Sequence, residues 1–275
     1  MLRADVVDCL ACPYCGLGLS IVDRSVRCGA GHSFDVARQG YVSLLPAGGR
    51  APAGDDAAMV AARAGFLAAG HYAPLTAALV ALGLDGVVLD VGAGTGQHLA
   101  AVLDPAPGAV GIALDASRYA ARRAAGVHPR VGAVVADAWA GLPVRTGAID
   151  AVLDVFSPRN GPETARVLRP GGLLVVVTPG PDHLTGLVDV LGGLAVDAAK
   201  DTRLAAALEP HLHLVDRTEH RWDLALPHPD AVHAVAMGPS ARHLTDLGSA
   251  VAALPDPVRA TASIVVTRYR RPVTG

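Results

Sequence analysis

Sulfur ligands are gathered at one end of the chain. All four cysteines, Cys9, Cys12, Cys15 and Cys28, precede His32. A disulfide framework spreads its cysteines and needs an oxidising compartment, whereas a metal site concentrates them. Three thiolates and one imidazole form the closed tetrahedral set of a structural zinc site. The cluster therefore predicts a bound Zn2+ ion. The opening residues MLRADVVD resemble no secretory leader, so we also expect a cytoplasmic protein.

Two overlapping Cys-x2-Cys pairs compete for the first half of this site. The Cys12/Cys15 pair encloses Pro13 and precedes Gly16, residues that fix a turn and let backbone amides point at thiolates. The Cys9/Cys12 pair lacks these features, so we favour the former. The alternatives are a site that uses Cys9, or reduced cysteines in a small buried corner. The preferred ligands are Cys12, Cys15, Cys28 and His32.

A glycine-rich segment follows a short apolar run later in the chain. It reads Asp90-x-Gly92-x-Gly94-x-Gly96. Glycines there let the backbone turn sharply and approach a ligand, and the following helix offers its amino end. Dinucleotide enzymes prefer Gly-x-Gly-x-x-Gly, and the third of those positions is Gln97 here. A nicotinamide-dependent oxidoreductase is therefore disfavoured.

Two more carboxylates end predicted strands. Asp115 is placed to accept both hydroxyls of a ribose, and Asp137, with the next backbone amide, to read an adenine edge. Each could be a simple strand-end cap, but with the glycine-rich segment they predict a nucleoside site. The Asp90 segment resembles motif I of S-adenosylmethionine-dependent methyltransferases. The segment LRPGG (Leu168–Gly172) resembles the approach to the fifth strand of the same enzymes.

Short apolar strands alternate with alanine-rich helices from Gly86 onward, which predicts parallel βαβ units and a sheet covered on both faces. Ligands of such sheets lie beyond the carboxyl ends of the strands. The predicted strands are Val87–Val91, Val110–Leu114, Val131–Val135, Ile149–Val155, Leu173–Thr178 and Thr261–Tyr269. The predicted helices are Gln97–Leu103, Ser117–Ala125, Pro162–Leu168 and Asp182–Leu191.

The N-terminal part has a different organisation. Residues 1–45 predict a zinc-binding β module with strands at Leu19–Val22 and Ser25–Arg27 and a core that includes Phe34, Tyr41 and Val42. Residues 46–85 predict a linker (Pro46–Gly54) and helices at Ala57–Ala69 and Pro74–Leu82, and residues 86–275 the catalytic domain. The predicted class is α/β: a class I methyltransferase (Rossmann-like) domain with a small N-terminal zinc-binding β module.

Composition excludes several classes of protein. Of the 275 residues, 51% are hydrophobic and 17% charged, which excludes a disordered chain. The longest apolar stretches, such as Tyr72–Leu84 and Gly171–Gly180, fall short of the ~20 residues of a membrane span. The net charge of −2 excludes a histone-like binder, but RNA binding needs only a local basic patch.

Taken together, these segments resemble the 23S rRNA (guanine-N1-)-methyltransferase family of the RlmA type over essentially the whole chain. The segment FSPRN (Phe156–Asn160) and the later VAMGPS (Val235–Ser240) resemble its actinobacterial branch, which acts in tylosin-type macrolide resistance. The other carrying segments are CPYCG (Cys12–Gly16), CGAGHSFDVARQGYVSLLP (Cys28–Pro46), GDDAAMVAARAGFLAAGHYAPL (Gly54–Leu75), DVGAGTGQHL (Asp90–Leu99) and LRPGGLLVVVTPGPDHL (Leu168–Leu184).

The resemblance implies S-adenosylmethionine and Zn2+ as cofactors and a 23S rRNA hairpin near the macrolide site as substrate. It implies the four preferred zinc ligands and donor contacts from Tyr72, the pair His98-Leu99 and His183. These join the donor residues expected from the motifs, which are Asp90, Gly92, Gly94, Asp115 and Asp137. It also implies a homodimer in which the zinc modules help to form an RNA-holding cleft.

The general base is not assigned. Guanine N1 carries a proton at pH 7 and must lose it, and Asp154 lies in the appropriate region. The arginines Arg24, Arg27, Arg38 and Arg159 are candidates for holding RNA phosphates. The alternative functions are a small-molecule methyltransferase and a non-catalytic zinc-ribbon RNA-binding protein.

Overall fold

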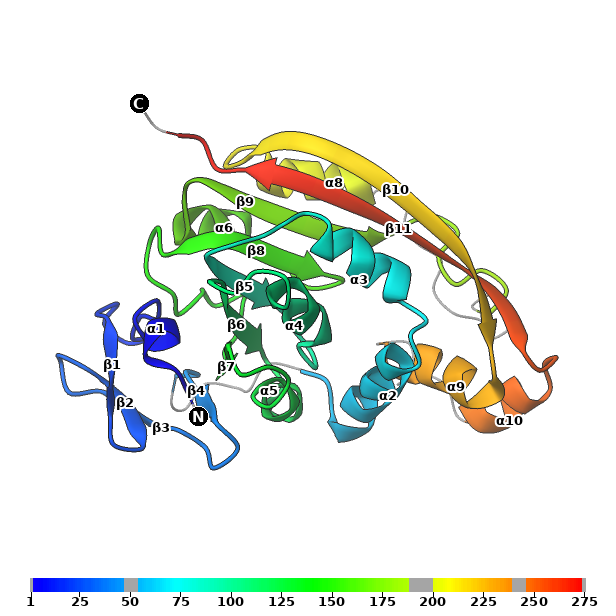
Figure 1. Cartoon of the computed structure of the whole chain (residues 1–275), viewed down its shortest axis with the longest axis horizontal. Helices are drawn as coiled ribbons and strands as arrows, with labels where there is room; N and C mark the ends of the chain where they lie inside the picture. Colours follow the sequence, from blue (N-terminus) through cyan, green and yellow to red (C-terminus); the bar gives the residue numbers. More distant parts are fainter. Residues whose placement is uncertain (1, 47–53, 188–199, 239–245, 274–275) are drawn as a thin grey trace.

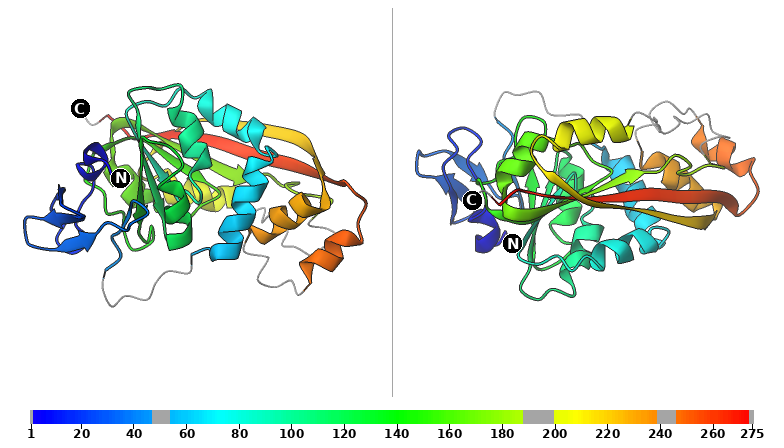
Figure 2. Two further views of the ribbon diagram at one scale, coloured as in Figure 1. Left: turned by 60° about the horizontal axis from the view of Figure 1, so that its bottom comes forward. Right: turned by 90° about the horizontal axis from the view of Figure 1, so that it is seen from above.

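A computed structural model describes residues 2–46, 54–187, 200–238 and 246–273, with the backbone alone at 200–203. Its centre is an eight-stranded sheet in the order β10-β11-β9-β8-β5-β6-β7-β4, with helices on both faces (Figures 1 and 2). A separate three-stranded sheet, β1-β2-β3, projects from one end. None of the helices in these described segments is long and apolar enough to cross a bilayer.

The parallel centre of the sheet matches the predicted strands. It consists of β5 (Val87–Val91), β6 (Val110–Asp115), β7 (Val131–Val135), β8 (Ile149–Val155) and β9 (Leu168–Pro179). These strands are nearly continuous runs of Val, Ile, Leu and Ala because both faces are buried. Their carboxyl ends meet at one edge, so Asp90, Asp115 and Asp137 lie at or just beyond it.

Two hydrophobic clusters cover the two faces of the sheet. One contains side chains of α1 (Ala4–Val7), α6 (Gly161–Val167) and α8 (Lys200–Leu208). The other contains side chains of α2 (Ala57–Ala68), α3 (Ala73–Val80), α4 (Gln97–Leu103), α5 (Arg118–Ala124), α9 (His228–Ala236) and α10 (Leu247–Ala252). The predicted helices at 97–103, 117–125 and 162–168 are confirmed to within a residue at each end.

Two long antiparallel strands complete the far side of the sheet. They are β10 (His213–Leu226) and β11 (Val258–Arg270), and β11 also pairs with β9. The second contains the predicted strand Thr261–Tyr269. The predicted helix Asp182–Leu191 is wrong in its described part, because residues 182–187 form consecutive turns; residues 188–191 lie outside the described chain.

The N-terminal segment is joined to the large sheet rather than folded around a core of its own. It contains β1 (Leu19–Val22), β2 (Ser25–Cys28), β3 (Ser33–Asp35) and β4 (Tyr41–Ser43), and β4 pairs in parallel with β7. Phe34 and Val42 belong to the cluster shared with the large sheet, whereas Tyr41 packs against the cluster on the opposite face.

Glycine on β7 permits this close attachment. A Cβ at Gly132 would lie 2.7 Å from Val6 of α1, so a larger residue there would displace the helix. Backbone hydrogen bonds from Ala11 to the Pro143 carbonyl and from Arg145 to the Cys9 carbonyl fix the segment further. We call residues 2–46 the zinc module, and its position relative to the large sheet is set by these contacts.

Candidate functional site

The four preferred metal ligands converge at one end of the zinc module. Ligand atoms of Cys12, Cys15, Cys28 and His32 all lie within 4.8 Å of one another. His32 Nδ1 is 3.4 Å from Cys12 Sγ and 3.3 Å from Cys28 Sγ, and the sulfurs of Cys15 and Cys28 are 3.6 Å apart. With Zn–S bonds of about 2.3 Å and Zn–N bonds of about 2.0–2.1 Å, a tetrahedral site has S···S edges of about 3.8 Å and S···N edges of about 3.5 Å, so each of these distances lies within about 0.2 Å of a zinc site.

Glycines in the left-handed region form the two turns that carry the ligands. Gly16 has φ 72° and donates its backbone N–H to the Cys12 carbonyl, and Gly31 has φ 88° and donates to the Cys28 carbonyl. Side chains other than glycine rarely adopt such angles. The buried Cys9 lies outside the cluster, where its thiol donates to the Asp5 carbonyl.

The cluster also favours ionised sulfur. Burial alone would raise the pKa of the Cys28 thiol, but backbone N–H groups of His32 and Ala30, the His32 ring and Cys15 lower it to about 6. Because zinc binds the thiolate form, a lowered pKa suits a ligand. The four side chains would hold the ion and stabilise the module. None of them lines the cavity at the carboxyl edge of the large sheet, which is described next.

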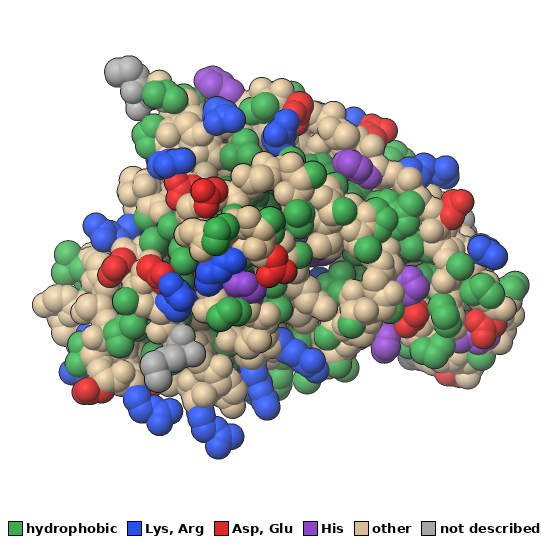
Figure 3. Space-filling view, in the orientation of Figure 1, with side chains coloured by type: hydrophobic (Ala, Val, Ile, Leu, Met, Phe, Trp, Pro, Cys, Tyr) green, Lys and Arg blue, Asp and Glu red, His purple; other side chains and the backbone are tan. Residues whose placement is uncertain are grey.

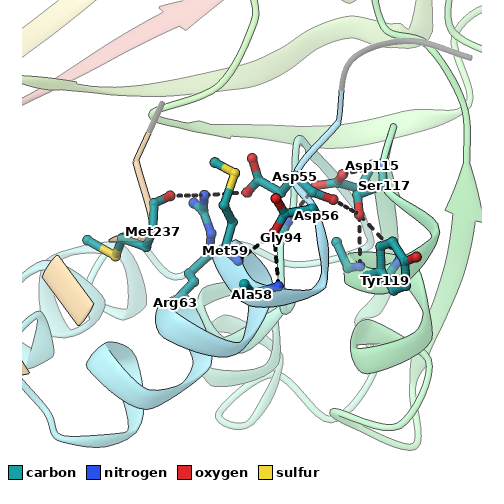
Figure 4. A network of polar contacts seen from close by, with 11 residues as sticks. Asp55, Asp56, Ala58, Met59, Arg63, Gly94, Asp115, Ser117, Tyr119 and Met237 are labelled. Carbon is teal, nitrogen blue, oxygen red and sulfur yellow. Dashed lines mark hydrogen bonds and ion pairs between the residues drawn. The ribbon is translucent and has the colours of Figure 1, made fainter. Parts of the chain in front are cut away.

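A cavity of about 360 Å3 opens at the carboxyl edge of the sheet, between the glycine-rich turn and the start of α5. Asp115 lies in its wall. One carboxylate oxygen accepts the Gly94 N–H at 2.8 Å and the other accepts the Ser117 N–H at 2.7 Å (Figure 4). Each oxygen keeps a further lone pair, so the carboxylate retains the capacity to accept two ribose hydroxyls.

The other expected nucleoside residues line the same cavity. Gly92 has φ 69°, and a Cβ there would lie 2.5 Å from the Ser157 side chain, so glycine is required for the turn to pass. Asp137 follows β7 and accepts the Trp139 N–H at 2.9 Å. Trp139 itself is 65% exposed at the cavity wall, a feature that was not expected from the sequence.

A second cavity of about 40 Å3 continues from the first, and the two share Arg63, Gly92 and Phe156 in their walls. Asp90 lines this smaller cavity and is 3% exposed. Burial, followed by the carboxylates of Asp154 and Asp115, raises the pKa of Asp90 well above its usual value. Burial beneath the glycine-rich turn thus disfavours the charged form of Asp90 relative to a carboxyl in water.

Tyr72 and His183 are brought together from distant parts of the chain. The Tyr72 hydroxyl lies 2.9 Å from His183 Nε2, and the Ser263 backbone N–H donates to His183 Nδ1 at 3.2 Å. A neutral imidazole that accepts at Nδ1 carries its proton on Nε2, which then donates to Tyr72. Burial raises the pKa of Tyr72, so its hydroxyl stays protonated at neutral pH.

The pair His98-Leu99 is divided between cavity and core. His98 lines the smaller cavity, and burial, followed by the charge of Arg63, lowers its pKa to about 4. The imidazole is therefore neutral at pH 7. The Leu99 side chain is fully buried and lies against Gly111 of β6, where a Cβ would be 3.0 Å from it. It belongs to the hydrophobic cluster on that face of the sheet.

Asp154 and Arg159 lie close to one another near the glycine-rich turn. Arg159 Nε is 3.5 Å from the Asp154 carboxylate, and their side chains are only 18% and 5% exposed. Little of the Arg159 side chain is exposed, and its Nε faces an acid, so its contact with RNA phosphates stays a prediction with less support than that of the exposed arginines. Asp154 does not line either cavity, so the geometry gives it no direct role in proton removal.

Three cavity residues were missed by reasoning from the sequence: Asp55, Arg63 and Trp139. A signal for one of them was present. Arg63 is the sole charged residue of α2, whose sequence is otherwise AAMVAA and AGFLA, and a lone charge in an apolar helix needs a reason to be there. Asp55 and Trp139 lie in short polar or irregular segments, where a polar or aromatic side chain does not differ from its neighbours in this way.

The fold and the two sites define a class I S-adenosylmethionine-dependent methyltransferase with an N-terminal zinc ribbon. The family model described as RlmA, N-terminal matches residues 10–50, and a methyltransferase domain model matches residues 88–172. A methyltransferase bound to the Trm112 activator of Haloferax volcanii has the same fold, with a TM-score of 0.53 and 18% identity over 80% of this chain and 98% of its own.

Relatives of similar length are closer in sequence. The chain is 48% identical to the 23S rRNA (guanine(748)-N(1))-methyltransferase of Streptomyces fradiae, over 98% of this chain and 99% of that protein. It is 50% identical, over the same shares, to a Micromonospora griseorubida protein assigned as a 23S rRNA (guanine-N(1)-)-methyltransferase. The chain belongs to the 23S rRNA (guanine-N1-)-methyltransferase family, and its cofactors are S-adenosylmethionine and Zn2+.

Proposed function

We propose that this enzyme transfers the methyl group of S-adenosylmethionine to N1 of a guanine in a 23S rRNA hairpin near the macrolide site. The observation that carries this proposal is the full-length similarity to the Streptomyces fradiae enzyme, which acts on guanine 748 of 23S rRNA. The equivalent guanine is the proposed target here. Residues 1–45 are assigned to RNA recognition, residues 46–85 to the connection, and residues 86–275 to donor binding and catalysis.

The donor is proposed to occupy both cavities. Asp115 would accept the ribose hydroxyls and Asp137 would bind the adenine edge in the larger cavity. Gly92 and Gly94 let the backbone approach the donor. Tyr72, Asp90 and His98 line the smaller cavity and, with Leu99 and His183, are proposed to bind the methionine end; the Tyr72 hydroxyl lies 2.9 Å from His183 Nε2.

An RNA path connects the zinc module to this site. A groove of about 600 Å3 is lined by Cys12 and Tyr14 of the module and by Arg145 of the large domain, and Asp137 lies in the walls of both the groove and the donor cavity. Tyr14 is 47% exposed and Trp139 is 65% exposed. Tyr14 lines the groove and Trp139 lines the adjoining donor cavity, and exposed aromatic rings of this kind are stacking platforms for unpaired bases.

Basic side chains are gathered beside this path. Figure 3 shows Lys and Arg side chains along the lower edge of the molecule, over the zinc module and α5. The exposed arginines of these elements are Arg24, Arg27, Arg38, Arg118, Arg122 and Arg123. The zinc module and α5 meet through β4, so their arginines form one surface despite the net charge of −2. Such a surface suits the phosphate backbone of RNA.

The chemistry requires positioning and loss of the guanine N1 proton. The bound donor supplies an electrophilic methyl group on a sulfonium. The chain would hold the extruded base against Phe156, which lines both cavities and has the left-handed φ of 55°. Strained backbone at such a position is a feature of functional sites. The buried Tyr72 hydroxyl remains protonated, so it orients groups rather than removing the proton.

Three further properties are proposed with this function. The enzyme acts in the cytoplasm, where its rRNA substrate is made. It acts as a homodimer whose zinc modules form the RNA-holding cleft, and sedimentation of the purified chain should give twice the monomer mass. Methylation of a Watson–Crick edge near the macrolide site adds bulk there and lowers susceptibility to tylosin-type drugs.

The proposed function is tested by mass mapping of 23S rRNA from a macrolide-sensitive host with and without the gene. One additional methyl on N1 of a single hairpin guanine is expected, together with a primer-extension stop at that base. A metabolite that accepts labelled methyl while the rRNA stays unchanged would instead favour a small-molecule methyltransferase.

A further inference from the structure

The donor's methionine end carries a carboxylate, and a carboxylate inside a protein is stabilised by hydrogen-bond donors, most strongly by a cationic one. Among the described residues that line the two cavities, Arg63 is the sole lysine or arginine. His98 lines the smaller cavity but is neutral at pH 7, because its pKa is lowered to about 4 by burial and by Arg63. Among these residues, the guanidinium of Arg63 is therefore the one positively charged group, and it is paired with the Asp55 carboxylate.

Arg63 lies where the two cavities meet. It forms part of both walls, and a Cβ at Gly94 would lie 3.0 Å from its Cδ and 3.5 Å from its Nε. Glycine in the motif I turn thus gives the arginine room to lie flat against the backbone. The Arg63 side chain is 27% exposed, so its charge is only partly solvated.

The hydrogen bonds of Arg63 leave its buried Nε–H group unused. Its Nη2 donates to the Asp55 carboxylate at 2.6 Å and to the Met237 carbonyl at 2.8 Å (Figure 4). Its Nε is buried and has no hydrogen-bond partner in the described chain. An unpaired buried N–H on a charged group is costly, and a ligand carboxylate would satisfy it.

Neighbouring elements hold the arginine in this position. The helix α2 begins at the Asp56 cap, whose carboxylate accepts the Ala58 and Met59 N–H groups. Gly65, on the same helix, allows close packing on α9, because a Cβ there would lie 2.7 Å from the His233 ring. Helix position, the Asp55 carboxylate and the Met237 carbonyl together fix the guanidinium before any ligand binds.

We propose that Arg63 binds the carboxylate of the methionine end of S-adenosylmethionine through Nε, with Asp55 as the residue that positions it. This inference rests on the proposed donor site. It extends that site because the residues expected from the sequence supply a tyrosine, two histidines, glycines and acids, but no lysine or arginine for the carboxylate.

The test compares two ligands that differ in the amino-acid end. S-adenosylhomocysteine has the carboxylate, whereas 5′-methylthioadenosine keeps the adenosine and lacks the amino acid. Calorimetry on the full chain should show that Arg63→Met weakens S-adenosylhomocysteine about 10- to 100-fold, the loss of one charge-assisted hydrogen bond. The affinity of Arg63→Met for 5′-methylthioadenosine should change by less than about twofold. The affinity of Arg63→Lys for S-adenosylhomocysteine should lie between those of the unaltered protein and Arg63→Met.

The ratio of the two affinities is an internal control for folding, since a damaged pocket would weaken both ligands together. Arg259→Met, at an exposed position of β11 outside both proposed binding sites, should leave the ratio at its original value. Equal losses for both ligands in Arg63→Met, or no loss for either, would overturn the inference. If the unaltered protein binds neither ligand, the donor site itself is wrong and the role of Arg63 falls with it.

Discussion

Replacement of Asp115 by alanine tests the nucleoside half of the donor site. The carboxylate holds two backbone N–H groups, at 2.8 Å from Gly94 and 2.7 Å from Ser117, and keeps one lone pair on each oxygen for a ribose hydroxyl. A hydrogen bond to a charged group contributes about 1.5–3 kcal/mol, so loss of one such bond weakens the donor about 10- to 150-fold. Loss of both bonds would exceed that range.

The same substitution also acts on the protein alone. Two backbone N–H groups lose a charged acceptor, at about 1.5–3 kcal/mol each, while the cost of burying the carboxylate is removed, so the free energy of unfolding should fall by less than the sum of about 3–6 kcal/mol. Asp115→Asn keeps one acceptor oxygen and presents an amide donor to the other N–H group. The donor affinity and the stability of Asp115→Asn should both be lower than those of the unaltered protein. Its donor affinity should be higher than that of Asp115→Ala.

Isothermal calorimetry with S-adenosylhomocysteine, paired with urea unfolding, measures both effects. Asp35→Ala removes an exposed acid from the zinc module and controls for the change in net charge. We expect Asp115→Ala to bind S-adenosylhomocysteine at least tenfold more weakly. The affinity of the control should change by no more than about twofold, which corresponds to less than about 0.5 kcal/mol in binding free energy. A folded Asp115→Ala variant with unchanged affinity would refute the ribose assignment.

Further predictions concern the metal, pH and RNA. Cys12→Ser should release the single zinc ion and abolish RNA methylation while Cys9→Ser retains the metal, as atomic emission would show; the opposite pattern would mean that the wrong pair was chosen. Because the pKa of His98 is about 4 in the folded state against 6.5 unfolded, stability is lost as pH falls from 6.5 toward 4, on the order of 2 kcal/mol by pH 5. Urea unfolding of His98→Asn should show a smaller loss between pH 7 and pH 5, and an identical loss would contradict the assignment. Trp139→Ala should weaken binding of a hairpin RNA about 5- to 100-fold, measured by fluorescence anisotropy, with little effect on S-adenosylhomocysteine; the reverse would place the ring over adenine.

The central strands and the metal ligands were predictable because their signals are local. Strands such as Val131–Val135 are short, apolar and bounded by turns, and burial on both faces gives them that composition. The turn residues Pro13 and Gly16 distinguish Cys12 and Cys15 from Cys9 without any knowledge of the fold. The structure places the four ligand atoms together at distances that suit zinc.

Other features depend on contacts that are distant in sequence. The three residues of β4 give too short a pattern to reveal pairing with β7, although that pairing joins the zinc module to the catalytic sheet. Most residues of β10 are exposed, so this strand lacks an apolar signature. Arg63 obtains its role from Asp55 and from Met237, which is more than 170 positions away, and no local pattern encodes such a contact.

The central claim is that the chain methylates a guanine of 23S rRNA and uses both the donor cavity and the zinc module to do so. The most direct measurement incubates the purified enzyme and S-adenosylmethionine with naked 23S rRNA and, separately, with ribosomal subunits, followed by mass mapping of N1-methylguanosine. We expect one methyl at one hairpin guanine in at least one substrate, and none with Asp115→Ala or Cys12→Ser. If the unaltered enzyme leaves both substrates unmethylated, the chain is not a 23S rRNA methyltransferase.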